Sequence, residues 1–475
     1  MESSALVQAL AELIGEDQVS SDPAVLRECS RDYIGFRQYE RGDGKFWEPK
    51  AACVAWPRNS VEVSSLLAFL NANGADAAPR TGGSCVSLGS EPVEGGVIVD
   101  GSRMNELIEL NEKDLFVTAS CGVSLEYLEN YLNNRGWTTG HFPQSLPMAQ
   151  IGGLVATRSI GQFSTLYGGI EDMVLGLEAV LPDGRIIKIK NVPRRSAGPD
   201  LRQIFIGSEG AIGFITQVSL KIFRYAPENR WMGAFGIDTM HKGLDALREI
   251  MSAGWHPAVL RLHDPVEMER DFGNIAPEGN CILLVIAEGP KALAAATGEG
   301  VKEILKGFGA ADLGARPVQR WLIHRNDVCG RLDHFDYYKM GAVADTCEIS
   351  ATWSKIGEIY DAVLERLPQE SESLVVVSGH SSHSYTTGTN IYFSFGAMVD
   401  KAENARPIYM NIVRVIMEET LKRGGSIAHH HGSGKYRTQW MPQEHGSSYI
   451  LLEKIKEALD PNRIMNKGVL LKIEE

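Results

Sequence analysis

Three consecutive histidines, His429, His430 and His431, precede two glycines, a lysine and an arginine in the segment IAHHHGSGKYRTQW. Imidazoles can bind a metal ion, transfer protons near neutral pH, or lie exposed on a turn. Neighbouring side chains of an extended chain point to opposite sides, so His429 and His431 could share one side with His430 turned away. By itself the run leaves metal binding, acid–base catalysis and a solvent-exposed turn open.

Three glycine-rich segments could bind a nucleotide. They are PRTGGSC (Pro79 to Cys85), QSLPMAQIGGLVATRSIGQFSTLYG (Gln144 to Gly168) and GSEGAIGFIT (Gly207 to Thr216). Gly82 and Gly83 can adopt backbone angles closed to other residues, so that successive N–H groups converge on an anion such as a pyrophosphate. The first segment alone could equally be a tight turn, and it lacks the GxGxxG spacing of a Rossmann fingerprint. The small residues and hydroxyls of the second segment would admit a flat cofactor ring, so the three together are more specific than any one.

Composition excludes several classes of protein. The chain has 475 residues, 44% hydrophobic and 23% charged, and a net charge of −13, which argues against non-specific nucleic-acid binding. Its seven cysteines are scattered without a CxxC pair, which is typical of a reducing compartment and predicts neither a disulfide framework nor a zinc ribbon. The N-terminus MESSALVQALAELIGEDQVSSDP has no signal-peptide pattern, and no apolar run approaches the ~18 residues of a membrane span. We therefore expect a cytoplasmic protein.

The first half of the chain has the pattern of short strands separated by glycine-rich turns. Residues 61–74 have helical periodicity and end at a glycine, and residues 124–136 form a second predicted helix with Ser124 as its N-cap. The segment 115–122 predicts a strand, and residues 173–189 predict a hairpin that turns at Pro182–Gly184. The glycine-rich segments would therefore lie in the loops that connect these elements.

Glycines become rarer after Phe223, and helices alternate with strands. Helices are predicted at 241–254 and 291–309, and strands at 258–264 and 281–289. The tail, residues 448–471, is predicted to be a helix that stops before Pro461 and a short strand-like end. This layer of sheet and helix would be a second domain packed closely on the first.

The motifs GGLVATRS…YGGIEDMV, GPDLRQIFIGSEGAIGFIT and GGSIAHHHGSGK resemble those of the vanillyl-alcohol-oxidase (PCMH-type) FAD-binding flavoproteins, and within them the alkyl-dihydroxyacetone-phosphate synthase branch. The resemblance covers nearly the whole chain. It implies an α+β fold, in which a PCMH-type FAD-binding domain of two subdomains carries an α/β cap domain with an antiparallel sheet. The implied division is a FAD-binding domain at 1–226, a cap or substrate domain at 227–425, and a C-terminal segment at 426–475 that returns to the FAD site.

The resemblance also implies which residues bind FAD. They belong to the glycine-rich segments: Pro79, Arg80, Thr81, Gly82, Gly83, Ser84, Cys85, Gln144, Ser145, Leu146, Pro147, Met148, Ala149, Gln150, Gly153, Thr157, Arg158, Ser159, Ile160, Glu209, Gly210, Ala211, Ile212, Gly213, Phe214 and Ile215. Some relatives attach the flavin covalently through a histidine in the first loop. Ser84 stands at that position here, so we expect non-covalent FAD.

By the same resemblance, Tyr392 in YTTGTNIYF is the acid–base catalyst and Arg261 in AVLRLHD is a second catalytic residue. His429, His430 and His431 inherit an active-site role. A phenol has an ordinary pKa near 10, so we expect a nearby cation to tune Tyr392. From the residues alone, Tyr392 could instead be a core tyrosine, and Arg261 could form a salt bridge to Asp264.

Related D-2-hydroxyacid dehydrogenases bind a divalent ion through motifs similar to HxxDGNxH and EHG. Tyr392 and His430 stand where two of those ligands would be, which leaves His380 and His383 without a metal to bind. No metal is therefore expected. The synthase branch also has an arginine, associated with the substrate phosphate, fourteen residues before a glutamate matching Glu348. His334 occupies that place, so His334, with Arg331 one turn away, is the predicted substrate-binding pair.

The resemblance implies an enzyme that exchanges the acyl chain of an acyl-dihydroxyacetone phosphate for a fatty alcohol, a step of ether-lipid synthesis without net redox change. The alternative is an FAD-linked oxidase or dehydrogenase of a hydroxy acid or alcohol, and a flavin-binding protein without catalysis is the third possibility. The implied partners are a small-molecule or lipid substrate, peripheral contact with a membrane and a second copy in a homodimer, with no nucleic acid.

Overall fold

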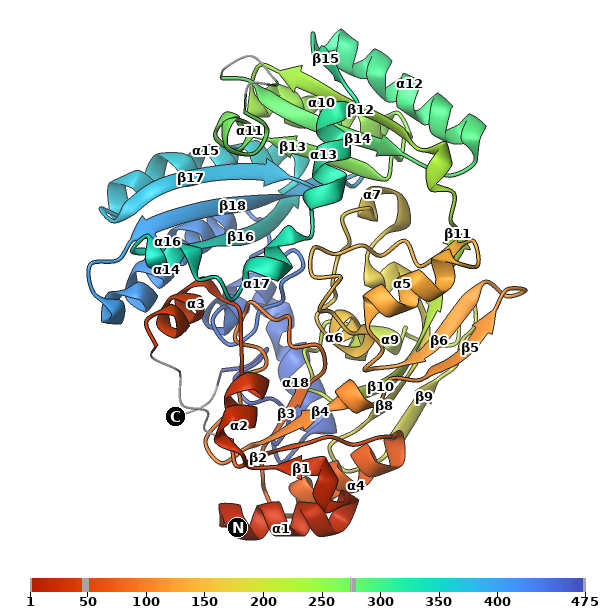
Figure 1. The fold of residues 1–475 in the computed structure, drawn as a ribbon, viewed down its shortest axis with the longest axis vertical. Coiled ribbons are helices and arrows are strands. Elements are labelled where there is room, and N and C mark those ends of the chain that lie inside the picture. The colour runs from red at the N-terminus through yellow and green to blue at the C-terminus, as the bar shows by residue number, and fades with distance from the viewer. Residues whose placement is uncertain (1, 45–50, 274, 276–278, 473–475) are drawn as a thin grey trace.

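A computed structural model describes residues 2–44, 51–273, 275 and 279–472 of the chain. Figure 1 shows two smaller sheets in the lower half of the molecule and a large sheet with its helices in the upper half. Helices and mainly antiparallel sheets are both present, so the predicted α+β class is confirmed. None of the helices in the described part of the chain is both long and apolar enough to cross a membrane.

The first sheet has four strands in the order β1-β2-β4-β3. Its strands are β1 (Val19–Ser20), β2 (Cys53–Ala55), β4 (Val97–Asp100) and β3 (Ala77–Arg80). It packs against α1 (Ser3–Ile14) and α4 (Ser60–Ala72) in one apolar core. The predicted helix at 61–74 is confirmed, because Asn59 caps it by accepting from two backbone N–H groups and Gly74 has a φ of 62° beyond its end. β3 leads directly into the first predicted cofactor segment.

The second sheet has five antiparallel strands in the order β5-β6-β10-β8-β9. They are β5 (Leu107–Asn111), β6 (Phe116–Ser120), β10 (Phe214–Lys221), β8 (Val174–Val180) and β9 (Ile186–Ile189). The sheet packs against α5 (Leu125–Asn133) and α6 (Ile151–Ala156). The predicted β8–β9 hairpin, the strand at 115–122 and the Ser124 N-cap are confirmed. Glycine-rich connections of this sheet therefore lie beside those of the first.

The third sheet has seven strands in the order β15-β12-β14-β13-β17-β18-β16, all antiparallel to their neighbours. The strands are β15 (Ala311–Gly314), β12 (Trp231–Ile237), β14 (Cys281–Ala287), β13 (Val259–His263), β17 (Leu374–Ser381), β18 (Gly388–Met398) and β16 (Ala342–Thr352). One face is covered by α10 (Met240–Ser252), α12 (Lys291–Gly307), α15 (Trp353–Glu370) and α16 (Ala405–Lys422) (Figure 1). The helices predicted at 241–254 and 291–309 and the strands predicted at 258–264 and 281–289 are confirmed.

Side chains alternate along the strands of this third sheet. Leu260 and Leu262 of β13 and Phe393 of β18 pack into the core beneath the helices. Arg261 and Tyr392 stand next to them in sequence, and both line a cavity on the opposite side of the sheet. Because successive side chains of a strand point to opposite faces, an apolar face and a chemically active face are built from the same strands.

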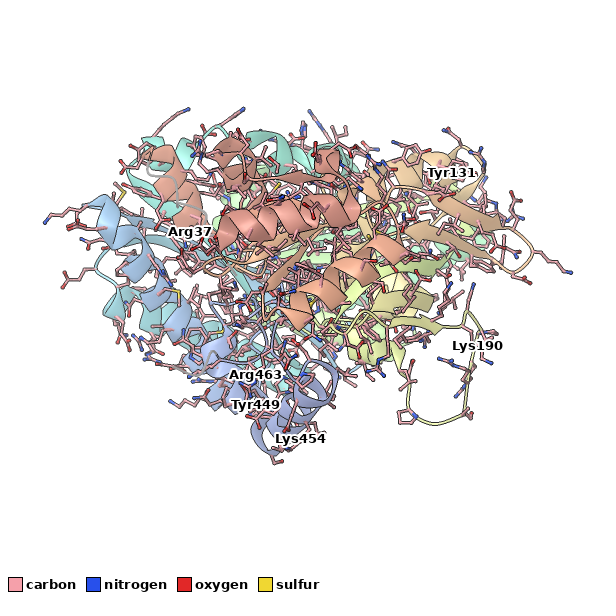
Figure 2. The ribbon with its side chains drawn as sticks, turned by 90° about the horizontal axis from the view of Figure 1, so that it is seen from below. Arg37, Tyr131, Lys190, Tyr449, Lys454 and Arg463 are labelled. Carbon is pink, nitrogen blue, oxygen red and sulfur yellow. The ribbon has the colours of Figure 1, made fainter. Side chains whose placement is uncertain are left out.

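Shorter elements connect the sheets. They are α2 (Pro23–Cys29), α3 (Gly35–Gly42), β7 (Trp137–Thr138), α7 (Ser164–Tyr167), α8 (Ile170–Met173), α9 (Arg202–Phe205), β11 (Phe223–Arg224), α11 (Pro265–Phe272), α13 (Arg316–His324), α14 (Asp336–Lys339) and α17 (Met441–His445). Figure 2 views the molecule from below and shows the loop that starts near Lys190 standing out from the body; residues 193–200 of this loop are exposed. Tyr449 and Lys454 mark α18 (Tyr449–Leu459) at the surface (Figure 2).

The tail differs from its prediction. α18 ends before Pro461 as expected, but the residues described after it, up to Lys472, do not form a strand. Asn466 and Leu470 have positive φ angles of 40° and 63°, which a strand does not allow. Within this described stretch only Met465 makes a bridge, with Ala77 of β3, and its buried side chain joins the core of the first sheet. Apolar side chains here anchor a turning segment, which explains why the composition resembled that of a strand.

Candidate active site

Four polar residues form a row across neighbouring strands of the third sheet. His263 lies opposite His380, His380 lies opposite Tyr392, and Tyr392 lies opposite Glu348. Residues directly opposite each other in a sheet share one face, so the row runs along the face opposite α10, α12, α15 and α16. Tyr392 stacks on His380 with ring centroids 4.6 Å apart and planes 17° from parallel. His380, which was expected to have no partner in the site, is therefore a central member of it.

A cavity of about 1270 Å³ separates this face from the predicted cofactor segments. Its volume exceeds the usual range of ligand pockets, roughly 300–1,000 Å³. Predicted FAD-binding residues on its wall are Pro79, Arg80, Thr81, Gly82, Gly83, Ser84, Cys85, Gln144, Ser145, Met148, Gln150, Gly153, Thr157, Ser159, Ile160, Glu209, Gly210, Gly213, Phe214 and Ile215. Tyr392, Arg261, His430 and His431 form part of the opposite wall. One cavity therefore unites segments that are far apart in sequence.

Six predicted FAD-binding residues do not line the cavity: Leu146, Pro147, Ala149, Arg158, Ala211 and Ile212. Ala149, Ala211 and Ile212 are buried behind the wall. The side chain of Arg158 is 55% exposed and pairs with Glu171 at 3.3 Å. A direct role in holding the cofactor is thus better supported for the residues on the wall.

The first loop has the properties that a dinucleotide phosphate requires. A Cβ added to Gly82 would lie 2.5 Å from the carbonyl oxygen of Met148, so the contact between the first two cofactor segments needs a glycine. Gly83 has a φ of 64°. The N–H groups of Gly82, Gly83 and Ser84 donate to no acceptor among the described residues, which leaves them for phosphate oxygens. Ser84 offers the cavity a hydroxyl instead of an imidazole, and this is consistent with non-covalent FAD.

The histidine run is curved by a buried carboxylate. Oε1 of Glu348 accepts from the backbone N–H groups of His429, His430 and His431 at 3.2, 3.1 and 2.9 Å. Three successive N–H groups can converge on one oxygen only where the chain bends around it. The expectation that His430 turns away from its neighbours was therefore wrong, because it assumed an extended chain. His430 and His431 both line the cavity, and His429 lies behind them.

Arg437, which was not predicted from the sequence to belong to the site, pairs with the buried carboxylate of Glu348. Its guanidinium is fully buried and donates to both carboxylate oxygens of Glu348, at 3.0 and 2.6 Å. Nδ1 of His431 lies 3.0 Å from the same carboxylate. Burial alone would raise the pKa of Glu348, but Arg437 and His431 hold it well below its ordinary value. Glu348 is therefore a permanent anion at neutral pH.

A second buried carboxylate, that of Glu209, holds the loop directly after the histidine run. Glu209 accepts from the backbone N–H groups of Ser433 and Gly434 at 2.8 and 3.0 Å, and from the hydroxyl of Ser433 at 3.0 Å. Glu209 was predicted to bind FAD, and it does line the cavity. Because both of its oxygens already accept from the histidine loop, its contribution to the cofactor site is to position that loop.

The hydroxyl of Tyr392 forms a short hydrogen bond with Nε2 of His430. Burial raises the pKa of Tyr392, and the carboxylate of Glu348 raises it further, while Arg261 opposes the shift. Arg261 is a nearby cation that acts on the phenol as expected, but burial and Glu348 outweigh it, so the net shift of the pKa is upward. Burial lowers the pKa of His430 well below its usual value, so the phenol and an uncharged imidazole can pass a proton between them.

Arg261 contacts imidazoles instead of a carboxylate. Its Nε donates to Nε2 of His263 at 3.0 Å, and its Nη2 lies 2.9 Å from Nε2 of His380. Nδ1 of His263 forms a hydrogen bond with Oε2 of Glu267 at 2.8 Å, so this ring carries its hydrogen on Nδ1. Nδ1 of His380 lies 2.8 Å from the same oxygen, but without the geometry of a hydrogen bond. Asp264 accepts from the backbone of Glu267 and of Gly379, and the alternative salt bridge to Arg261 is not formed.

Burial also controls the charges of Arg261 and His380. It lowers the pKa of Arg261 and lowers the pKa of His380 to about 4. His380 is therefore neutral at pH 7, and the guanidinium is the exposed charge of the group on the cavity wall. A cation whose nearest partners are neutral rings is suited to bind an anionic part of a substrate.

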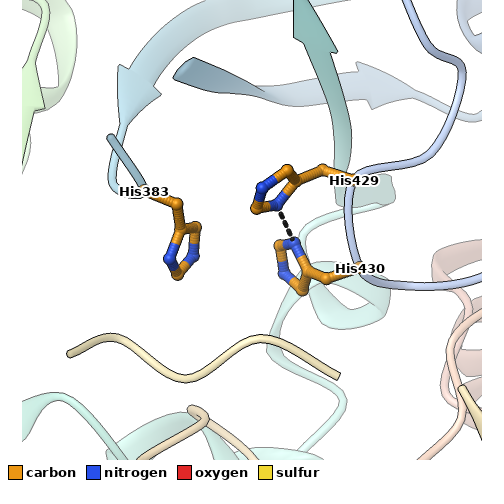
Figure 3. Close-up of side chains that lie close together, drawn as sticks. All are labelled: His383, His429 and His430. Atoms are coloured by element: carbon orange, nitrogen blue, oxygen red, sulfur yellow. Dashed lines mark hydrogen bonds between the residues drawn. The ribbon is translucent and has the colours of Figure 1, made fainter. Parts of the chain in front are cut away.

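Among the residues that the structure describes, two groups of side chains have spacing compatible with a metal ion. In the first, ring nitrogens of His383, His429 and His430 lie within 4.8 Å of one another (Figure 3). Nδ1 of His429 and Nδ1 of His430 are 2.8 Å apart, so a hydrogen atom lies between them. In the second, His263, Glu267 and His380, the Nε2 atoms of both histidines already meet Arg261. Protons and the guanidinium occupy these nitrogens, and the expected absence of a metal stays a prediction.

The two residues predicted to bind the substrate phosphate are placed differently. Arg331 is exposed but lines the cavity. His334 is also exposed, and it is not part of the wall. It follows α13 in a connecting segment that turns its side chain to solvent, which sequence spacing from Glu348 could not reveal. Another cation of this segment, Arg325, does line the cavity and was missed.

Comparisons with known proteins agree with this geometry. Residues 51–190 match the FAD binding domain, and residues 226–470 match the C-terminal domain of FAD linked oxidases. The chain is 44% identical to the uncharacterized FAD-linked oxidoreductase YgcU of Escherichia coli (strain K12), over 99% of both chains. It is 29% identical to the alkyldihydroxyacetonephosphate synthase of Caenorhabditis elegans, over 88% of this chain and 76% of the relative. It is 26% identical to the D-lactate dehydrogenase of Archaeoglobus fulgidus, over 89% and 93%.

Solved structures show the same fold at low identity. An alkyldihydroxyacetonephosphate synthase has a TM-score of 0.81 and 22% identity, over 98% of this chain and 86% of the other. A p-cresol methylhydroxylase with bound substrate has a TM-score of 0.75 and 15% identity, over 99% and 97%. The fold is therefore the PCMH type.

Proposed function

The chain belongs to the family of FAD-dependent enzymes that join an FAD binding domain to the C-terminal domain of FAD linked oxidases, and we propose that it exchanges the acyl chain of an acyl-dihydroxyacetone phosphate for a fatty alcohol. The observation that carries the proposal is the Tyr392–His430 hydrogen bond at the wall of the large cavity. The similarity to alkyldihydroxyacetonephosphate synthases over most of the chain supports the same reaction.

The reaction is written so that its atoms balance. The bond between the substrate carbon and the fatty-acid oxygen breaks, a bond from that carbon to the alcohol oxygen forms, and the alcohol gives up its proton. Bound FAD would supply a reversible electron acceptor beside that carbon. Tyr392 takes the proton from the substrate carbon and later returns one, with His430 as its partner.

Other parts of the wall suit the rest of such a substrate. Arg261 offers a positive charge for an anionic group. Val375, Val376, Phe395 and Met398, on β17 and β18, add apolar surface against which an alkyl chain can pack. The combination of a charged part and an apolar part favours an amphiphilic substrate over a small hydroxy acid.

The test is an exchange assay with FAD-loaded enzyme. Acyl-dihydroxyacetone phosphate is incubated with fatty alcohols of several chain lengths, and the ether product and released fatty acid are measured by mass spectrometry. We expect one ether for each acid released. Failure to form an ether with every chain length would exclude this function.

A second candidate is oxidation of a hydroxy acid or alcohol by the same cofactor. It is favoured by the position of His334 off the cavity wall, since the residue that stands at the place of the phosphate-associated arginine of the synthase branch does not face the cavity. Anaerobic mixing with a panel of 2-hydroxy acids and alcohols distinguishes the two. Bleaching of the flavin by a member of the panel supports oxidation, and a flavin that stays yellow counts against it.

We expect Arg325 to bind the phosphate in place of that arginine. Its guanidinium lies 5.4 and 5.3 Å from the rings of Phe142 and Phe163 and donates to Gln162 at 3.2 Å. Burial lowers its pKa to about 10, so it is still charged at neutral pH. No carboxylate within the described part of the chain forms an ion pair with it. An unpaired cation on the cavity wall attracts an anionic ligand.

Arg325→Gln is therefore expected to raise KM for a phosphate-bearing substrate about 10- to 100-fold, the effect of losing one charge-assisted hydrogen bond. kcat should change less, because Arg325 is not one of the residues that move the proton. Steady-state kinetics measures both. Arg248→Gln, an exposed arginine on α10, is the matched control. An unchanged KM in Arg325→Gln would place the phosphate elsewhere.

Several further proposals follow from the resemblance. They are the division into domains at residues 226 and 425, a homodimer, peripheral contact with a membrane, a cytoplasmic location and a role in ether-lipid synthesis. Size-exclusion chromatography with light scattering tests the dimer, and flotation with phospholipid vesicles tests membrane contact.

A further inference from the structure

Four side chains form an unbroken series of hydrogen bonds that begins at the cavity. The hydroxyl of Tyr392 meets Nε2 of His430, and Nδ1 of His430 lies 2.8 Å from Nδ1 of His429. Nε2 of His429 lies 2.7 Å from the hydroxyl of Tyr385. Figure 3 shows the central contact, between His429 and His430. Each imidazole therefore uses both of its nitrogens within the series.

The two ends of the series differ in their surroundings. Tyr392 and His430 line the cavity, whereas His429 and Tyr385 are not part of its wall. Tyr385 is partly exposed, and the two residues after it, Thr386 and Thr387, are exposed. The series thus runs from the reacting centre toward the outer surface of the loop that joins β17 to β18.

We propose that Tyr392, His430, His429 and Tyr385 form a proton relay between the cavity and solvent, with Tyr385 as its outer end. The proposal rests on and deepens the function proposed above, because it says how Tyr392 can take a proton from the substrate while a different proton is released to solvent. In the framework of that function, Tyr385 and His429 are positioning residues that act through Tyr392.

One arrangement of hydrogens satisfies every contact in the series. Tyr392 donates to Nε2 of His430, whose Nδ1–H donates to Nδ1 of His429, whose Nε2–H donates to the oxygen of Tyr385. The hydroxyl of Tyr385, which also contacts the side chain of Ser164, then keeps its own proton for an acceptor outside the series. Reversing every bond gives a second complete arrangement, in which the hydroxyl of Tyr392 points toward the substrate.

Interconversion of the two arrangements moves one proton without leaving a charge in the series. When Tyr392 accepts a proton from the substrate carbon, its own proton passes to His430, the Nδ1 proton passes to His429, and the Nε2 proton passes to Tyr385. Tyr385 then releases a proton to solvent. The reverse sequence makes Tyr392 a proton donor, so the same four groups serve both the base step and the acid step.

The electrostatics of the site support neutral relay groups. Burial lowers the pKa of His429 to about 4, and it lowers the pKa of His430 well below its usual value. Burial raises the pKa of Tyr385, with a smaller contribution from the carboxylates of Glu171 and Asp172. A neutral imidazole has one donor and one acceptor, as each position in the relay requires. Glu348 fixes the backbone of both histidines and therefore their separation.

The first test needs no substrate. FAD-loaded enzyme labelled with 15N in its histidine rings is studied by NMR, and His429→Gln identifies the His429 signals. We expect one protonated and one unprotonated nitrogen in each ring, with a strongly downfield hydrogen between the two Nδ1 atoms. Tyr385→Phe, which keeps the ring and removes the hydroxyl, should shift the nitrogens of both histidines. Tyr127→Phe, at a 56% exposed tyrosine, is the matched control and should shift neither.

Charged imidazoles with both nitrogens protonated, or an unaltered His430 spectrum in Tyr385→Phe, would overturn the relay. This outcome does not depend on the identity of the substrate.

The second test measures how many exchangeable protons move together during turnover. The exchange of acyl-dihydroxyacetone phosphate with a fatty alcohol is run in mixtures of ordinary and heavy water, and the rate is plotted against the deuterium fraction of the solvent. Because the relay moves several exchangeable protons in one step, we expect a curved plot for the wild type and a straight line with a smaller solvent isotope effect for Tyr385→Phe. Loss of structure would lower the rate by the same factor at every deuterium fraction and leave the shape of the plot unchanged.

An unchanged shape of this plot in Tyr385→Phe refutes the relay. If the wild-type enzyme forms no ether at all, the proposed function fails, and the NMR result then decides the relay by itself.

Discussion

Replacing Tyr392 by phenylalanine is expected to lower kcat about 10²- to 10⁴-fold, the range that general acid–base catalysis contributes. The phenyl ring keeps the stacking on His380, and only the hydroxyl that meets His430 is lost. Flavin content should not change, because the loops predicted to hold FAD lie on the opposite wall. The measurements are turnover in the exchange assay and the ratio of flavin absorbance to protein.

Two further variants sharpen the Tyr392 experiment. His430→Gln removes the partner of the hydroxyl, and the double variant should be about as slow as Tyr392→Phe alone, because groups that act as a unit give non-additive losses. Tyr127→Phe should retain full activity. A Tyr392→Phe enzyme within threefold of the wild-type rate would show that the proton is moved by another group.

Replacing Glu348 by alanine is expected to lower the free energy of unfolding by about 3–5 kcal/mol, the usual cost of leaving one charge of a buried pair uncompensated. The substitution leaves Arg437 buried without its anion, and it removes the acceptor of three backbone N–H groups of the histidine loop. The rate of the exchange reaction should fall as well, because the loop that carries the histidine run loses its curvature. Urea unfolding followed by tryptophan fluorescence measures the stability.

A paired substitution separates charge from packing. Glu348→Met combined with Arg437→Met removes both charges, and it should recover part of the lost stability, since an apolar pair avoids an unpaired buried ion. It should not recover activity, because methionine cannot accept from the three N–H groups. Equal stability of the wild type and Glu348→Ala would refute the anchoring role.

The same carboxylate predicts a dependence of stability on pH. The pKa of Glu348 in the folded protein lies well below its ordinary value of about 4.3, so the unfolded chain binds the proton first. Its contribution is therefore fully present above about pH 4.3 and is lost as pH falls toward the folded pKa. Unfolding curves of the wild type should lose stability over this interval more steeply than those of Glu348→Gln.

The order of helices and strands could largely be predicted from periodicity and capping residues. Asn59 and Ser124 begin helices by accepting backbone N–H groups, and Pro182–Gly184 turns a hairpin, because these effects depend on neighbours in sequence. The exception is the tail, where the positive φ of Asn466 and Leu470 depends on anchoring at Ala77, nearly four hundred residues earlier.

The loops of the cofactor site and the groups able to do chemistry could be recognised from residue types in the sequence alone. Pro79–Cys85 contains the glycines that allow a close approach to phosphate, and Tyr392, Arg261 and the histidine run lie on the cavity or next to it. These features are recognisable because each one depends on residue types at short spacing.

How those groups act depends on the tertiary structure. Only the register of β13, β17, β18 and β16 puts His263, His380, Tyr392 and Glu348 in one row. Only in the folded chain does Arg437 reach Glu348. The histidine run is curved there as well, so that His430 contacts Tyr392. A one-residue change of register would turn every side chain of a strand to the other face, and this choice is made by contacts distant in sequence.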